Sequence, residues 1–395
     1  MTDLLLAGIG QLVTNRGEPL RNAAIAIEGD TITYVGGEAD APTLGNGVLL
    51  HCEGAAVLPG FVDAHTHLIF DGDRSDEFSR RLAGDSYRQI ASEGGGILST
   101  VTATRAASEE RLFGLAATRA WRMIRSGTTT IEVKSGYGLD LETELRLLRV
   151  ARRLGEDLPI TVRTTFLGAH SIPPEYRNDR SGYIDLLVER MLPEVAALAD
   201  YCDVFVEEGV FGIDEARRIF SSAAGFGLGA RVHAEQLTRF GGAQLAAEIG
   251  ATSADHLDHA TSDDASALAG AGTSAVLVPG ASYTLRAEQA PGPMFLEAGC
   301  NVALATDCNP GTSYFESMGA IISLAVVQMG LSVDQAIDAA TRGGAVSLGF
   351  EDRGVIESGA RADLIVLDAP SVTHIPYRPA TNLVSTVISG GVVIP

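Results

Sequence analysis

Apolar residues in the middle of the chain occur in short runs rich in β-branched residues. We count eight of these runs: FVDAHTH, TTTIEVKS, ITVRTTFLGAH, CDVFVEE, GARVHAE, SADHLDH, SAVLVPG and NVALATD. Stretches with helical spacing separate several of them, including ATRAWRMIRS, ETELRLLRVARRLG and DEARRIFSSAAG. Repeated alternation of strand and helix predicts a parallel sheet.

Eight strand–helix units spread over residues 58–352 favour an α/β fold of the (β/α)₈ TIM-barrel type, which typically takes ~250 residues before insertions. A doubly wound open sheet is the competing fold. An insertion between residues 71 and 107 contains GGGI at 94–97, where glycines would allow a mobile or tightly folded loop beside the first strand end.

Both chain ends have a different pattern. Short apolar segments alternate with Gly-containing turns in LLLAGIGQLVT, AAIAIEGDTITYVGG and GVLLHCEGAAVLPG, and again in GVIESGARADLIVLDA and LVSTVISGGVVIP. These patterns are typical of β-strands joined by turns. We therefore expect residues 1–57 and 353–395 to pair into a small β-sandwich domain, with residues 58–352 forming the barrel.

Composition narrows the classes of function. The chain is 46% hydrophobic and 20% charged, which is typical of a globular protein. Its formal net charge of -21 and the lack of a Lys/Arg-rich run argue against a nucleic-acid partner. No apolar run reaches the ~18 residues that span a bilayer, and the first residues do not resemble a signal peptide. Four cysteines without a CxxC pair indicate reduced thiols and a cytoplasmic location.

Polar residues recur where the predicted strands end. His65 and His67 end the first run, Lys134 the second, His170 the third, and further runs end at His233, His256 and Asp307. In a barrel of this type the carboxyl ends of all the strands form one rim, and that rim carries the active site. We therefore expect these side chains to converge.

The stretch GFVDAHTHLIFDGDR places two imidazoles at positions i and i+2, which face the same side of a strand. A third imidazole from His233 and a carboxylate from Asp307 would complete a His₃Asp metal site, a ligand set that suits zinc and also iron or manganese. A single strand-end histidine is usually only hydrogen-bonded, so the prediction rests on the combination. His256 could be a fourth imidazole ligand or a neighbour of the attacking water.

Lys134 has two interpretations. A carboxylated lysine could bridge two metal ions, but an ion-paired or structural lysine is the preferred interpretation. The four cysteines do not join this site by spacing, although Cys308 lies next to Asp307.

At these residues the sequence resembles the amidohydrolase superfamily, through PGFVDAHTH, HAE, DHLDH and ATDCNPGT over essentially the whole chain. The stretches DAHTHLIFDGDR, EVKSGYGL, FLGAH, VHAEQL and DCNPGTS are similar to those of the imidazolonepropionase family within it. That resemblance implies hydrolysis of 4-imidazolone-5-propanoate to N-formimidoyl-L-glutamate, a step of histidine degradation, and it also suggests a homodimer.

The resemblance also implies roles for individual residues. One divalent or trivalent metal ion per chain, zinc or iron, would be held by His65, His67, His233 and Asp307. Asp307 and His256 would be catalytic, with His256 near the attacking water. The substrate contacts would be Arg74, Tyr137, His170, Gln236, Asn309, Gly311 and Thr312.

Two of these positions need comment. Some family members carry a carboxylate where this chain has Gln236, and an amide cannot act as a base. Proton transfer should therefore depend on Asp307 and His256. Arg74 can offer a bidentate fork to the substrate's carboxylate; the alternative is a surface salt bridge with Asp71, Asp73 or Asp76.

Two rival functions share part of this pattern. Another amidohydrolase reaction, such as deamination of a nucleobase, would use the same metal ligands, but Arg74, Tyr137 and the NPGT loop suit a substrate with a carboxylate tail. A metal-stabilised binding protein without activity is the second rival. Structural zinc sites usually have closely spaced, often Cys-rich ligands, whereas the ligands here are scattered along the chain.

Overall fold

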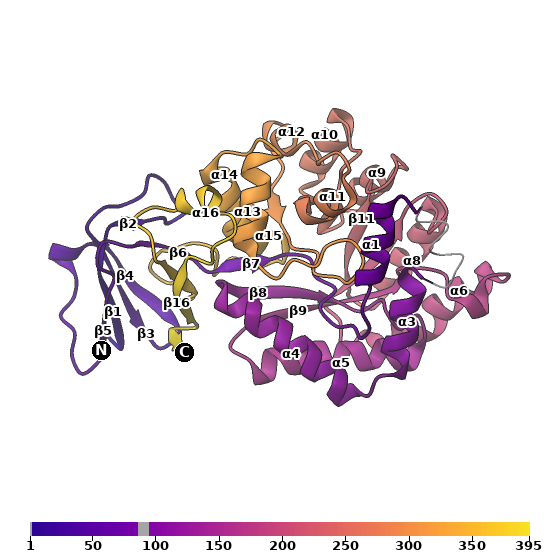
Figure 1. Cartoon of the computed structure of the whole chain (residues 1–395), viewed down its shortest axis with the longest axis horizontal. Helices are drawn as coiled ribbons and strands as arrows, with labels where there is room; N and C mark the ends of the chain where they lie inside the picture. The colour runs from indigo at the N-terminus through magenta and orange to yellow at the C-terminus, as the bar shows by residue number, and fades with distance from the viewer. Residues whose placement is uncertain (1, 86–94) are drawn as a thin grey trace.

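A computed structural model describes residues 2–85 and 95–395. Its centre is a barrel of eight parallel strands in sequence order from β7 to β14 (Figure 1). The strands are β7 (Phe61–Asp63), β8 (Thr128–Lys134), β9 (Thr161–Ala169), β10 (Tyr201–Val206), β11 (Gly229–Ala234), β12 (Ser253–His256), β13 (Ser274–Leu277) and β14 (Val302–Leu304). Seven lie within the predicted apolar runs and β10 begins one residue before its run, so the barrel prediction is confirmed and the open sheet is wrong.

The barrel closes between its first and last strands through side chains and isolated contacts. The Asp63 carboxylate accepts hydrogen bonds from the backbone N–H of Thr306, at 3.0 Å, and from its hydroxyl, at 2.6 Å. Just beyond, Thr66 forms a parallel bridge with Cys308. β7 ends at Asp63, so His65 and His67 lie just past the regular strand rather than within it.

Helices surround the barrel. Those before β12 are α4 (Glu109–Arg125), α5 (Leu141–Asp157), α6 (Arg180–Leu186), α7 (Leu192–Val195), α8 (Ile213–Gly225) and α9 (Gly242–Glu248). The later ones are α10 (Ser262–Ala271), α11 (Pro279–Leu285), α12 (Gly292–Glu297), α13 (Met318–Val327), α14 (Val333–Asp338) and α15 (Gly344–Ser347). Single π-helical turns, Leu187–Met191 and Ala339–Gly343, join α6 to α7 and α14 to α15.

These helices pack against the barrel through one apolar face, as α5 illustrates. In α5 the side chain of Asp140 accepts a hydrogen bond from the N–H of Thr143 and begins the helix. Leu147, Leu148 and Leu154 of this helix are fully buried. Their spacing of one, six and seven residues keeps them on the side of the helix that faces the strands.

The chain ends form two further sheets beside the barrel (Figure 1). One contains β4 (Thr31–Gly37), β3 (Ala23–Glu28), β1 (Leu4–Ile9) and β5 (Val48–His51). The other contains β17 (Val392–Ile394), β16 (Val384–Ser389), β15 (Leu364–Leu367), β6 (Ala56–Pro59) and β2 (Gln11–Leu12), and so mixes strands from both ends.

The two sheets share one apolar core, to which Leu6 and Ile25 contribute from the first sheet and Leu364 and Ile388 from the second. A β-sandwich built from both chain ends is therefore confirmed. The domain boundaries, 1–57 with 353–395 and 58–352, stay a prediction. A short helix, α16 (His374–Tyr377), lies between β15 and β16.

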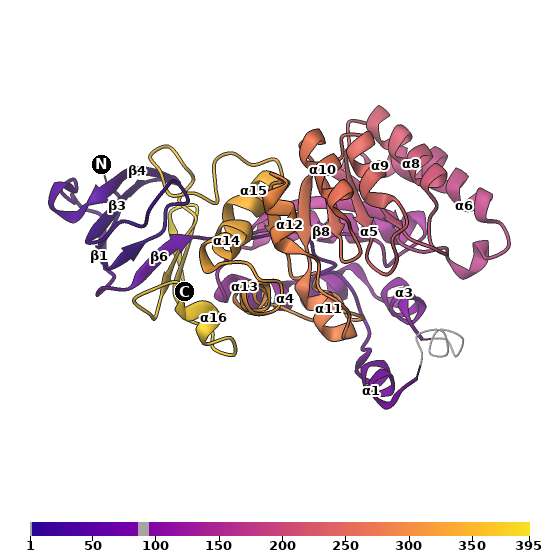
Figure 2. The ribbon, with the colours of Figure 1, turned by 90° about the horizontal axis from the view of Figure 1, so that it is seen from above.

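The insertion after the first strand carries two helices, α1 (Ser75–Ala83) and α3 (Ile97–Ala106). Figure 2 shows α1 standing out from the barrel beside α3. Gly94, part of the GGGI stretch, is outside the described residues. Within residues 2–85 and 95–395, the longest helices are too short or too polar to span a bilayer.

Candidate active site

Three imidazoles meet inside the rim of the barrel. Nε2 of His67 lies 3.2 Å from Nε2 of His65 and 3.4 Å from Nε2 of His233. Oδ1 of Asp307 lies 3.5 Å from the Nε2 atoms of both His65 and His67. All four side chains are buried. The sequence-predicted ligands from three strand ends are thus brought together.

Two carboxylates fix the orientation of two of these rings. Nδ1 of His65 donates to Oδ2 of Asp255 over 2.6 Å, and Nδ1 of His233 lies 2.9 Å from Oδ2 of Asp203. Because a carboxylate only accepts, the bond to Asp255 holds a proton on Nδ1 of His65 and leaves its Nε2 lone pair facing the cluster. The His233–Asp203 contact has the distance of an ion pair without the geometry of a hydrogen bond. Asp203 and Asp255 were not found by sequence reasoning, although each occurs in a predicted strand.

A metal ion fits this cluster. Burial, together with neighbouring Lys134 and histidines, lowers the pKa of His65 and His67 well below the usual range, so both rings are neutral near neutral pH and each can offer one nitrogen lone pair to a cation. Ligand atoms of a tetrahedral site with bonds of ~2.0–2.1 Å lie about 3.3–3.4 Å apart, close to the observed spacing. The buried His/Asp cluster is therefore suited to a divalent metal ion.

Lys134 lies in a buried ion network below the histidines. Its Nζ donates to Glu132 over 2.8 Å and lies 2.9 Å from Oδ2 of Asp203 and 3.5 Å from Oδ2 of Asp255. Burial lowers the pKa of Lys134, but the carboxylates of Asp203 and Glu132 more than offset this and raise it overall. Lys134 is thus ion-paired, and the network keeps both positioning carboxylates ionised.

His256 and Asp307 have left-handed backbone conformations, with φ of 77° and 50°. Such strain costs ~1–3 kcal/mol and persists only where the surroundings enforce it. The Nδ1 atom of His256 is buried without a hydrogen-bond partner among the described residues. Burial raises the pKa of Asp307 well above its usual range, and a nearby cation would favour the ionised form. His256 also forms a possible ligand group with His65 and Asp307, so its two interpretations stay open.

A cavity of 340 Å³ opens above the histidine cluster. This volume lies within the range of small-molecule sites. The residues with predicted substrate contacts all line it, although they come from distant parts of the chain: Arg74, Tyr137, His170, Gln236, Asn309, Gly311 and Thr312. His67, His233, His256 and Asp307 line the same cavity. The fold therefore places three of the four predicted metal ligands and all the predicted substrate contacts around one cavity, with His65 buried behind them.

Arg74 enters the cavity beside Gly311. Its Nε and Nη2 atoms each lie 2.9 Å from Oε2 of Glu77, and its side chain is only 8% exposed. A salt bridge with Asp71, Asp73 or Asp76 is therefore the wrong alternative; Asp71 pairs with Arg111 instead. A Cβ atom on residue 311 would overlap Nη1 of Arg74, so a side chain there would displace the guanidinium from its present position.

The loop after Asp307 is held by its own asparagine. Oδ1 of Asn309 accepts from the backbone N–H groups of Gly311 and Thr312, both at 2.8 Å, and Nδ2 donates to the carbonyl oxygen of Asp307 over 2.7 Å. These two N–H groups are thus engaged within the loop. A ligand that used them would have to share them with Asn309.

His170 and Tyr137 form the opposite wall. The His170 ring stacks on His67 with centroids 4.9 Å apart, and its Nδ1 donates to the carbonyl oxygen of Gly136 over 3.0 Å. Burial lowers the pKa of His170 to about 3, so the ring is neutral and its Nε2 is an acceptor.

Glu144 holds the loop that carries Tyr137, a role that sequence reasoning missed. Its carboxylate accepts hydrogen bonds from the backbone N–H groups of Gly136, Gly138 and Leu139. The backbone beside Gln236 is held in a similar way, because the Glu207 carboxylate accepts a hydrogen bond from the N–H of the next residue, Leu237, at 2.8 Å. The sequence offers one signal for Glu144: an acidic residue in the first turn of a predicted helix, shortly after the glycines of SGYGL.

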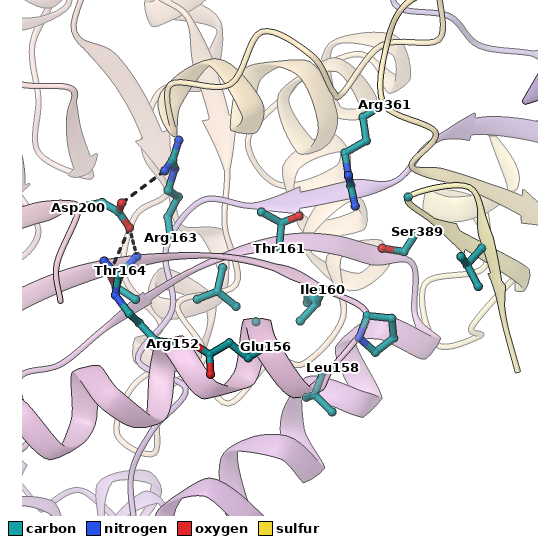
Figure 3. Close-up of a pocket in the computed structure, with 15 residues that line it drawn as sticks. Arg152, Glu156, Leu158, Ile160, Thr161, Arg163, Thr164, Asp200, Arg361 and Ser389 are labelled. Carbon is teal, nitrogen blue, oxygen red and sulfur yellow. Dashed lines mark hydrogen bonds and ion pairs between the residues drawn. The ribbon is translucent and has the colours of Figure 1, made fainter. Parts of the chain in front are cut away.

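The larger cavity of the chain is elsewhere. It has a volume of 570 Å³ and lies at the opposite end of the barrel, where the start of β9 meets the C-terminal sheet (Figure 3). Two of its arginines form ion pairs: Arg163 lies 3.3 Å from Asp200, and Arg361 lies 3.3 Å from Asp30. No histidine lines it, so it lacks the acid–base and metal-binding groups of the rim.

Comparison with known proteins gives a consistent result. Residues 56–394 match the amidohydrolase family. The chain is 46% identical to imidazolonepropionase of Symbiobacterium thermophilum, over 98% of this chain and 96% of that protein. It is also 46% identical to imidazolonepropionase of Streptomyces griseus, over 99% of each chain.

Solved structures with lower sequence identity share the fold. N-isopropylammelide isopropylaminohydrolase from Burkholderia multivorans superposes with a TM-score of 0.74 at 21% identity, covering 100% of this chain and 98% of that one. A zinc-bound adenosine deaminase from Xanthomonas campestris has a TM-score of 0.74 at 20% identity, covering 99% and 92%. At these identities the likeness establishes the barrel with its added sheets.

Proposed function

The chain belongs to the amidohydrolase family and, within it, to the imidazolonepropionases, and we propose that its rim cavity hydrolyses the ring of 4-imidazolone-5-propanoate. The single product of this step of histidine degradation is N-formimidoyl-L-glutamate, in which ring opening has converted the ring carbonyl into a new carboxylate group. The observation that carries the assignment of residues is the meeting of a buried His/Asp cluster and Arg74 in one 340 Å³ cavity.

His65, His67, His233 and Asp307 would hold the metal ion. When bound, such an ion supplies Lewis acidity that lowers the pKa of a water molecule from 15.7 toward ~7. Asp255 would orient His65 for this role through its hydrogen bond to Nδ1, and Asp203 lies against Nδ1 of His233. Whether the ion is zinc or iron is a question for metal analysis, since imidazole and carboxylate ligands suit both.

Asp307 would move the proton. Its carboxylate takes a proton from the attacking water as the water oxygen bonds to the ring carbonyl carbon. It then delivers that proton to the ring nitrogen as the carbon–nitrogen bond breaks. His256 orients the water and donates toward the developing oxyanion. Gln236 has no proton to give or take at neutral pH, and it serves as a hydrogen-bonding partner of the ring.

The remaining wall would orient the substrate. The Arg74 guanidinium binds the propanoate, and the neutral His170 offers an acceptor to a ring N–H. Tyr137 is an additional hydrogen-bonding group on the same side. Local donors of this kind matter because the net charge of -21 gives an anionic substrate no long-range attraction.

The direct test is to supply 4-imidazolone-5-propanoate to the purified, metal-loaded protein. We expect formation of N-formimidoyl-L-glutamate without release of ammonia. Nucleobases serve as the comparison substrates: ammonia release from them, with no ring opening of the imidazolone, would favour the deaminase function instead. A protein that unfolds on metal removal and hydrolyses neither substrate would be the binding protein.

A homodimer and a cytoplasmic location complete the proposal. The dimer follows from the family resemblance, and light scattering of the purified protein tests it. The location is supported by four buried free thiols, Cys52, Cys202, Cys300 and Cys308, because reduced cysteines are typical of reducing compartments. Cell fractionation tests the location.

A further inference from the structure

Glu77 makes contacts that the proposed chemistry does not use. It lies in the first turn of α1, and its carboxylate is only 16% exposed, although it lies on a helix that stands out from the barrel. Its two oxygens have separate partners. Oε2 faces Arg74, while Oε1 accepts from the N–H of Gly96 at 3.0 Å and from the hydroxyl of Ser99 at 3.2 Å.

The contact with Arg74 uses one particular edge of the guanidinium. Glu77 engages Nε and Nη2, both at 2.9 Å. A guanidinium has five N–H donors in a planar fork, so this pairing leaves the Nη1–Nη2 end for another carboxylate. Gly311 has no side chain to displace Nη1 from that position. The arginine is therefore fixed with a bidentate edge still available.

The contact with Gly96 and Ser99 fixes a second part of the cavity. Gly96 precedes the first residue of α3, and its φ of 75° is a conformation that favours glycine. Ile97, the next residue, lines the 340 Å³ cavity together with Arg74. One carboxylate thus joins the arginine that would bind the ligand's charge to the apolar wall beside it.

From these contacts we propose that Glu77 is a positioning residue for substrate selection, which presets the Arg74 fork and the Ile97 wall to accept a carboxylate tail. The inference rests on the proposed function of Arg74. Glu77 acts through its neighbours and takes no part in proton transfer. Its removal therefore weakens binding of the tail and leaves the metal cluster, built on β7, β11 and β14, unchanged.

The opposite role for Glu77 predicts the opposite result. If Glu77 competed with the ligand for Arg74, its removal would free the guanidinium and tighten ligand binding. If it positions Arg74, removal loosens the fork and weakens binding. The sign of the change in KM therefore separates the two roles.

The test compares Glu77→Gln with Asp76→Asn, an exposed acidic neighbour in the same helical turn. For Glu77→Gln we expect KM for 4-imidazolone-5-propanoate to rise about tenfold, the effect of one charge-assisted hydrogen bond, with kcat and metal content little changed. Asp76→Asn should leave both constants as in the wild type. A lower or unchanged KM in Glu77→Gln overturns the proposal.

A second measurement separates this inference from the reaction itself. Binding of 3-(imidazol-4-yl)propanoate, which has a ring and tail but no ring carbonyl to hydrolyse, is measured by calorimetry in the same variants. Weaker binding in Glu77→Gln supports the proposal even if the wild type turned over no imidazolone, which would instead refute the proposed function. Equal binding in all three proteins overturns the positioning role.

Discussion

The two ends of the barrel carry cavities of opposite character. The cavity at the carboxyl ends of the strands is the smaller, at 340 Å³, yet it holds four histidines and Asp307. The cavity at the other end, shown in Figure 3, is larger, at 570 Å³, and its lining includes the ion pair of Arg163 with Asp200. The larger volume is therefore at the end of the barrel that lacks the histidine cluster.

The two cavities differ in whether their polar groups are paired with one another. At the rim, the ring nitrogens of three histidines face one another, and a buried carboxyl has a raised pKa. These groups are incomplete without a cation or ligand. At the other end, Asp200 accepts from the N–H of Thr164 at 2.8 Å and pairs with Arg163. These contacts pair charged groups with one another, as expected of residues that stabilise a fold, although Nε of Arg163 and Nε of Arg361 are buried without a hydrogen-bond partner among the described residues.

The largest effect should come from the metal ligands. We expect His67→Ala or His233→Ala to abolish both metal binding and activity, because each removes one of the converging nitrogens. Metal analysis and hydrolase assays measure the two losses. His374→Ala, in the α16 segment away from the rim, is the control. Full metal occupancy in both rim variants would show that the ligand assignment is wrong.

Asp307→Asn should have the next largest effect. The amide keeps the size of the side chain but cannot accept the water proton, so kcat should fall by ~10²–10⁴, and metal affinity could fall as well. Gln236→Glu should be tolerated, since relatives are expected to carry a carboxylate there. If the two variants were equally damaging in steady-state kinetics, our division of their roles would be refuted.

Variants of Arg74 test whether its positive charge, at the edge of the same cavity, binds the substrate. Arg74→Ala should raise KM by about tenfold to a hundredfold, the effect of losing ~1.5–3 kcal/mol of charge-assisted hydrogen bonding. Arg74→Lys keeps the charge but loses the fork, so an intermediate loss is expected. Both variants should retain the metal. A wild-type kcat/KM in Arg74→Ala would mean that the substrate's carboxylate binds elsewhere.

Glu144→Gln should produce a smaller change that depends on pH. Burial raises the pKa of Glu144 above its usual 4.5, so the folded protein keeps a proton that the unfolded chain has released. Stability from this group therefore decreases as pH rises above about 4.5. The glutamine variant should lose that slope in denaturant unfolding and loosen the Tyr137 loop, raising KM a few-fold. An unchanged slope would contradict the assignment.

The smallest effect on activity is expected at the other end of the barrel. Arg163→Ala removes an ion pair with Asp200 and a stacking contact with the Phe350 ring, 4.3 Å away. Partly exposed contacts of this kind are worth about 1 kcal/mol, so unfolding should be slightly easier while kcat/KM stays at the wild-type value. A large loss of activity would show that the two ends are coupled.

The sequence by itself determined much of the site, for local reasons. Strand and helix periodicity identified all eight barrel strands, and the i, i+2 spacing put His65 and His67 on one side of the chain. Because a parallel barrel gathers its strand ends at one rim, His233 and Asp307 could be placed with them. Resemblance to a family added the substrate residues, which a periodic pattern does not identify.

Only the tertiary structure decided how these groups are held. Asp255 contacts His65 although the two residues are 190 positions apart in the sequence. Asp63 contacts Thr306 because the first and last barrel strands, β7 and β14, come together although they are not paired in the hydrogen-bonded strand order. The tertiary structure also pairs Lys134 with Glu132 and Asp203. It pairs Arg74 with Glu77 rather than with Asp71, Asp73 or Asp76. Local periodicity specifies which side of a strand a residue faces, whereas hydrogen bonds over a few ångströms depend on strand order, register and closure.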